Sequence, residues 1–155
     1  HLGLPFAFAS HFAPAQLDAA LRIYRERFQP SATLDRPHAM VGMTVVAADT
    51  DEEAVLLASS LDQSFVALRY GNPGKLRPPV PGYRESLPPQ YLPGLEFLRE
   101  TGAIGSPAKV RQDILRFIER TQADELILAG NIWDPQARQR SLKLTMEAMR
   151  EPLPA

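Results

Sequence analysis

The chain has 155 residues, of which 45% are hydrophobic and 23% charged, a balance that excludes a disordered or fibrous protein. Its 17 basic and 18 acidic residues give a net charge of -1 without a long basic run, so nucleic acid is not an expected partner. Cysteine is absent, which excludes disulfides and thiolate chemistry. No apolar stretch is long enough to span a membrane and no signal-peptide pattern occurs, so we expect a soluble, cytoplasmic protein without a membrane partner.

The first half of the sequence alternates apolar runs with segments of helical period. Residues 4–9 form a short apolar run that predicts a buried strand, and Pro14 suits the first turn of a helix. Residues 39–48 are continuously apolar and rich in valine, which is typical of a buried parallel strand. Thr50 and Glu53 have the spacing of a capping box at the start of a second helix.

Residues 69–101 interrupt this alternation, since glycine and proline recur too often for a long helix or strand. Loops of this length inside compact domains are usually lids or binding loops, and we expect a lid that contains one short helix. The alternation resumes with a weak strand at 102–105, a helix that starts at Pro107, a strand at 125–130 and a final helix capped by Asp134.

Four strand–helix units in this order predict an α/β fold in which helices cover a parallel sheet. The sequence has no internal repeat and no linker, so residues 1–155 are expected to form a single domain or part of one, with 69–101 as an insertion. The chain starts at His1, directly before a strand-like run, and this indicates a sequence that is entered midway.

Four segments resemble the bacterial luciferase-like flavin-dependent monooxygenase family at compatible spacing. They are GLPFAFASHFAP at 3–14, GNPG at 71–74, IGSPAKV at 104–110 and ADELILAGNIWDPQARQRSLKL at 123–144. Each segment is a weak signal by itself, but their order makes them specific together. The resemblance implies the C-terminal half of a (β/α)8 TIM barrel, from about the fifth strand to the last helix, and so a partial domain whose N-terminal half is absent.

Members of that family bind reduced FMN, or in one branch a deazaflavin, at the C-terminal mouth of the barrel. The resemblance therefore implies a flavin-dependent oxidoreductase that uses reduced FMN and oxygen on a small organic substrate such as an aldehyde. A separate flavin reductase would supply the reduced FMN, and a deazaflavin is the less favoured cofactor. Alternatively, the fragment alone is a catalytically inactive structural piece, which forms a homo-oligomer or pairs with the missing half through its open sheet.

Barrel enzymes carry their chemistry on the loops that follow the strands. If the resemblance holds, His11 is the catalytic residue and hydrogen-bonds near the reacting flavin ring. Ser10, His11, Phe12 and Asn131 are then the expected flavin contacts. The insertion contributes the expected lid and substrate residues, which are Tyr70, Gly71, Gly74, Lys75 and Arg77.

These candidates also have purely structural interpretations. Backbone groups can satisfy His11, and Lys75 and Arg77 can be solvated surface charges. Ser106, at the start of a helix, is more simply a helix cap than a phosphate site. The three histidines lie far apart in the sequence, so no metal centre is expected.

Overall fold

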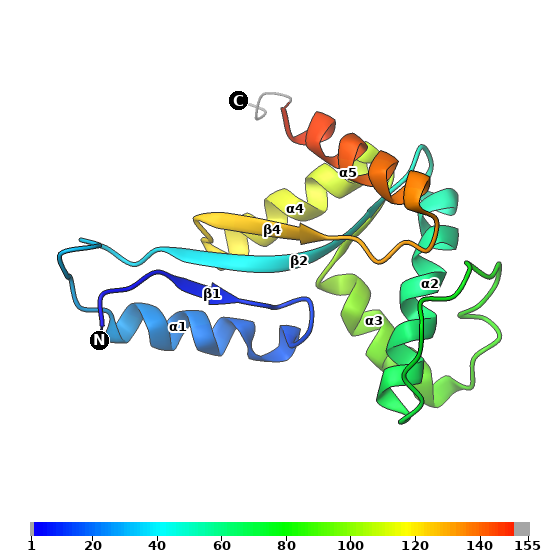
Figure 1. The fold of residues 1–155 in the computed structure, drawn as a ribbon, viewed down its shortest axis with the longest axis horizontal. Coiled ribbons are helices and arrows are strands. Elements are labelled where there is room, and N and C mark those ends of the chain that lie inside the picture. The colour runs from blue at the N-terminus through cyan, green and yellow to red at the C-terminus, as the bar shows by residue number, and fades with distance from the viewer. Residues whose placement is uncertain (1, 151–155) are drawn as a thin grey trace.

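The computed structural model describes residues 2–150, which form a four-stranded sheet with helices packed against it (Figure 1). The strands are β1 (Phe6–Phe8), β2 (Ala39–Ala47), β3 (Ala103–Gly105) and β4 (Glu125–Ala129). The helices are α1 (Leu17–Arg27), α2 (Asp51–Arg69), α3 (Leu92–Glu100), α4 (Pro107–Thr121) and α5 (Pro135–Arg150). Short 3-10 turns, η1 (Pro14–Gln16) and η2 (Pro89–Tyr91), precede α1 and α3. The predicted alternation is confirmed, and the short helix expected in the insertion is α3.

β2 is the central strand, and all its neighbours run parallel to it. β1 pairs with residues 39–41, β4 pairs with residues 40–44 on the opposite edge, and β3 pairs with residues 45–47. In a barrel wound strand by strand, β4 would pair with β3. β3 has only three residues and lies along the last part of β2, so the edge at 40–44 is taken by β4. A parallel α/β fold is therefore confirmed, whereas half of a barrel is not.

The hydrophobic core lies on one face of this sheet. Paired residues of parallel strands share a face, so alternate side chains of β2 point toward the same helices. This core joins β2 to α1 and α4, and in Figure 1 α4 lies behind β2 and β4. Its buried members include Leu17, Leu21, Val41, Met43, Val45, Val110, Ile114 and Phe117. A second cluster packs α2 against the last part of β2, with Val46, Ala48, Ala54, Ala58, Ile104 and Ile132.

The opposite face of the first part of the sheet, which we call the open face, is not covered in the same way. Ala7 is paired with Met40, and Gly42 is paired with Ile127. Ala7 is exposed, Met40 is half-buried and Ile127 is 52% exposed. Figure 1 looks onto this face of β1, β2 and β4. None of the helices within residues 2–150 is long and apolar enough to cross a membrane.

The N-cap at the start of α2 is confirmed, because the Glu53 amide donates a 3.1 Å hydrogen bond to Oγ1 of Thr50. The second bond of the predicted capping box is shifted by one residue, since the Glu53 carboxylate accepts from the Asp49 amide at 3.3 Å. Replacing Thr50 by alanine is expected to lower the free energy of unfolding by about 1 kcal/mol, since one amide in the first turn loses its partner. Urea denaturation at neutral pH measures this. Thr33→Ala, the same change at an exposed loop position, is the control with little expected effect. Equal losses in the two variants would contradict the capping role.

Candidate active site

The segments that follow the four strands leave the sheet in the same direction, because the strands are parallel, but β1 ends beside Val41, β4 beside Thr44 and β3 beside Ala47. Ligands of parallel α/β sheets bind outside the carboxyl ends of the strands. The chain leaves β1 through Ser10–Phe12, β2 through Ala48–Thr50, β3 through Ser106, and β4 through Gly130–Trp133. These segments include the residues that the sequence predicts as flavin contacts.

Ser10 and His11 are held against β2 at Gly42. Ser10 is 3% exposed, and its hydroxyl donates a hydrogen bond to the carbonyl oxygen of Gly42. The His11 ring lies over the same residue, since a Cβ built on Gly42 would overlap Nδ1 and lie 2.8 Å from Cε1. The imidazole therefore occupies the place that a side chain of β2 would take on the open face.

The surroundings of His11 favour a neutral imidazole. Its Nδ1 atom is buried and has no hydrogen-bond partner among the described residues. Burial lowers the pKa of the His11 imidazole, because the charged form loses hydration that nothing in the site replaces. Since Nδ1 points into the protein, Nε2 is the nitrogen left to meet a ligand. At neutral pH this nitrogen offers one hydrogen bond and no positive charge.

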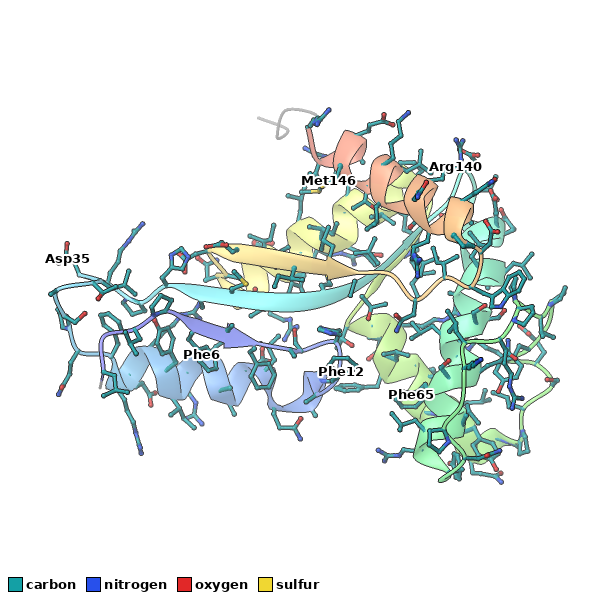
Figure 2. All side chains as sticks on the ribbon, in the orientation of Figure 1. Phe6, Phe12, Asp35, Phe65, Arg140 and Met146 are labelled. Carbon is teal, nitrogen blue, oxygen red and sulfur yellow. The ribbon has the colours of Figure 1, made fainter. Side chains whose placement is uncertain are left out.

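Phe12 and Asn131 lie at the same end of the sheet but differ in their surroundings. The Phe12 ring is 77% exposed, and its centroid is 4.2 Å from that of His11; Figure 2 shows it beyond the carboxyl end of β1. Asn131 is also exposed, and within residues 2–150 it makes no hydrogen bond to Ser10, His11 or Phe12. The structure thus groups Ser10, His11 and Phe12 around Gly42, with Asn131 at the neighbouring strand end.

The expected lid residues begin at the other end of α2. The 19 residues of α2 start beside the carboxyl end of β2, so Tyr70 lies about 28 Å away at 1.5 Å per residue. The Tyr70 ring packs edge-on against Tyr91, with centroids 4.3 Å apart. Gly71 has a φ of +74° and Gly74 has open space around it, while Lys75 and Arg77 are exposed. The structure does not bring these five residues to His11.

The insertion then returns along α2 toward the strand ends. The Val80 amide donates a 2.8 Å hydrogen bond to Oγ of Ser59, and Nε2 of Gln63 donates to the Pro78 carbonyl at 2.8 Å. Residues 80–85 consequently lie over the first half of α2. The end of α3, rather than residues 80–85, adjoins β2 near the candidate site, since a Cβ on Gly102 would lie 3.1 Å from the carbonyl oxygen of Thr44, two residues from Gly42.

Asp51 occupies the N-terminus of α4, a feature that the sequence analysis missed. Its Oδ1 atom accepts a 2.6 Å hydrogen bond from the Ser106 amide, and bonds to Ser106 are the main reason that the pKa of Asp51 is lowered. The Ser106 amide is therefore not free for a phosphate. Ser106 is the N-cap residue of α4, as predicted, and its carbonyl oxygen accepts a 2.9 Å hydrogen bond from the Val110 amide, although its side chain makes no capping bond.

A buried ion pair lies beneath the returning insertion and was also missed. Asp62 of α2 is fully buried and accepts a 2.7 Å hydrogen bond from Arg99 of α3. Burial raises the pKa of the Asp62 carboxyl, although Arg99 opposes the rise. Both residues line a cavity of about 270 Å³ that residues 80–85 cover. Its position on the flank of α2 separates it from the His11 site.

Comparison with known proteins supplies the family. No protein-family model matches the sequence. A luciferase-like monooxygenase of Escherichia coli strain K12 is 43% identical over 150 residues, which are 97% of this chain and 45% of that protein. The crystal structure of apo-MsnO8 has a TM-score of 0.84 at 28% identity, and the match covers 98% of this chain and 47% of that one.

A third similar structure contains a flavin. It is the oxygenating constituent of 3,6-diketocamphane monooxygenase from Pseudomonas putida in complex with FMN, with a TM-score of 0.58 at 22% identity. The match covers 97% of this chain and 43% of that enzyme, and it shows a shared fold. The chain spans about half the length of the curated relatives it matches. By sequence, this chain belongs to the family of luciferase-like monooxygenases.

Proposed function

We propose that this chain forms the C-terminal half of a TIM-barrel flavoenzyme that oxidises a small organic substrate, such as an aldehyde, with reduced FMN and oxygen. The observation that carries the proposal is the His11 imidazole, which follows the carboxyl end of β1 and lies over Gly42 of β2, with Nε2 left to meet a ligand. Its support is the sequence match to a luciferase-like monooxygenase and the FMN complex of a protein with the same fold. We further propose a cytoplasmic protein that receives reduced FMN from a separate reductase.

The residues around Gly42 suit the uncharged ring system of a flavin better than its phosphate. His11 offers Nε2 without positive charge, and the exposed Phe12 ring provides an apolar surface next to it. The Ser10 hydroxyl donates a hydrogen bond to the carbonyl oxygen of Gly42 and so holds the turn that carries His11 in place. We propose that the exposed Asn131 side chain supplies a polar contact to the flavin. When bound, the reduced flavin supplies the two electrons that the oxidation with oxygen requires.

The phosphate group needs a different site. The helix N-terminus at Ser106 is occupied by the Asp51 carboxylate, which would repel a phosphate. We therefore propose that a segment outside these 155 residues binds the phosphate. A deazaflavin, which carries the same kind of ring system, is the less favoured cofactor. Residues 69–101 are proposed as the lid that excludes water from the flavin.

An anaerobic titration with reduced FMN, followed by oxygen and an aliphatic aldehyde, tests this function. We expect the change in the absorbance of the reduced flavin to saturate at one equivalent. After oxygen is admitted, one of its atoms should enter the carboxylic acid product and the other should form water. His11→Ala is expected to reduce acid formation at least tenfold, about 1.4 kcal/mol of lost stabilisation, because the ring-side hydrogen bond is removed. Stoichiometric binding without any acid would overturn the monooxygenase assignment for aldehydes.

A second candidate function is a structural piece without activity of its own, and the open face favours it. Ile127 is 52% exposed there, and an unclosed parallel sheet can pair with further strands. The partner would be another copy of this chain or the other half of the barrel. Analytical ultracentrifugation distinguishes the two functions when combined with the flavin titration: an oligomer that does not bind reduced FMN supports the structural piece.

A further inference from the structure

Gly42 is a glycine in a place where the backbone does not require one. It lies within β2, between Val41 and Met43, and its φ is outside the left-handed range. A glycine inside a strand costs about 0.5–1 kcal/mol relative to alanine, because it loses more conformational freedom on folding. An interaction of this particular position must therefore explain the glycine.

The His11 ring supplies that explanation. A Cβ on Gly42 would overlap Nδ1 of His11, with no backbone atom among the three nearest contacts. The carbonyl oxygen of Gly42 also accepts the hydrogen bond from Ser10. One residue thus leaves space for the imidazole and anchors the turn that carries it.

We infer that Gly42 is the positioning residue of the candidate site: its missing side chain lets the His11 imidazole lie on β2 with Nδ1 inward and Nε2 outward. The inference extends the proposed function, since it assigns what the outward nitrogen recognises. An imidazole held in this way binds an uncharged hydrogen-bonding group, such as a ring carbonyl, in preference to an anion. Gly42 consequently selects the ring part of a ligand over a phosphate.

The first test is the titration of His11 by NMR in the ligand-free protein. The chain has three histidines, so His11 and His38 can be followed together. His38 contacts Glu125 at the amino end of β2 and serves as the internal reference. In Gly42→Ala the added methyl group should expel the ring into solvent, and the pKa of His11 should rise toward its ordinary value. Gly74→Ala, at a position with open space, should leave both titrations unchanged.

A thermal stability cycle covers the case in which the single variant folds poorly. Gly42→Ala should lower the melting temperature of the wild-type protein, but should leave it unchanged or raise it in a His11→Ala background, where the space is empty. Equal losses in both backgrounds would overturn the inference, as would an unchanged His11 titration in folded Gly42→Ala.

Neither experiment contains a flavin, so the positioning role and the proposed function can fail separately. A third measurement tests both together: the dissociation constant for reduced FMN should rise at least tenfold in Gly42→Ala and stay unchanged in Gly74→Ala. If the wild-type chain binds no FMN while the titration and the stability cycle behave as expected, the proposed function fails and the positioning role stands. If Gly42→Ala binds FMN as wild type does, the assigned recognition by His11 is wrong.

Discussion

Replacing Arg99 by alanine is expected to lower the free energy of unfolding by about 3–5 kcal/mol, since the buried Asp62 carboxylate then loses its hydrogen-bonded cation and keeps only the weaker attraction of Arg84. The Asp62 side chain is fully buried on α2, and that of Arg99 on α3 is 16% exposed. The ion pair links α2 to α3 beneath residues 80–85 of the insertion. Urea denaturation at pH 7 measures the loss, which is a large part of the total stability of an ordinary domain.

This loss should depend on pH in a defined direction. The pKa of Asp62 is raised, so the folded protein binds its proton more readily than the unfolded chain does. Stability therefore falls as pH rises through the window between the unfolded and folded pKa values. Without Arg99 that pKa rises further, and the destabilisation should be smaller at pH 4 than at pH 7. Lys143→Ala, which removes an exposed 3.8 Å pair with Glu147, should cost less than about 1 kcal/mol at either pH. A loss from Arg99→Ala that is the same at both pH values would contradict the role of Asp62.

The second large effect is expected on the covered face of the sheet. Ile114→Ala on α4 should destabilise the protein by about 2–5 kcal/mol, because Ile114 is 1% exposed and its removal leaves a cavity against β2. Ile127→Ala is the matched variant on the open face, where the side chain is 52% exposed, and its cost should stay below about 1 kcal/mol. Thermal or urea denaturation of both variants compares the two faces. Similar losses would show that the open face is packed in solution.

The elements of the fold were predictable from local patterns. The continuous apolar run at 39–48 predicted β2, and the capping box at Thr50 predicted the start of α2, because both depend on neighbouring residues in the sequence. The short strand β3 was predicted as weak, in agreement with its three residues. These features need no knowledge of distant partners.

The pairing of β4 with β2 could not be predicted in the same way. Leu126 and Leu128 show that β4 is apolar, but they are compatible with any neighbouring strand. β4 can pair with residues 40–44 of β2 because the short β3 pairs only with residues 45–47. This pairing is decided when the sheet assembles, not by the local sequence of β4. The half-barrel expected from the resemblance assumed the consecutive order instead.

The site was predicted in part. His11 was a candidate through the family resemblance and its place after a strand, but Gly42, 31 positions further along the chain, was read only as a member of an apolar run. A single glycine inside a strand pattern is the signal that was available, since it often marks a close approach. Asp62 was missed because only the apolar residues of α2 were used to predict that helix. Its pairing with Arg99 also depends on how the insertion folds back onto α2, which the sequence does not reveal.

The most direct test of the candidate site is the NMR spectrum of the histidine ring protons during an anaerobic titration with reduced FMN. The Cε1 proton of His11 should shift in proportion to flavin bound and saturate at one equivalent, whereas that of His38, which contacts Glu125 before the start of β2, should stay in place. Binding that leaves His11 unmoved, or that shifts His38 alone, would contradict a flavin site at the carboxyl ends of the strands.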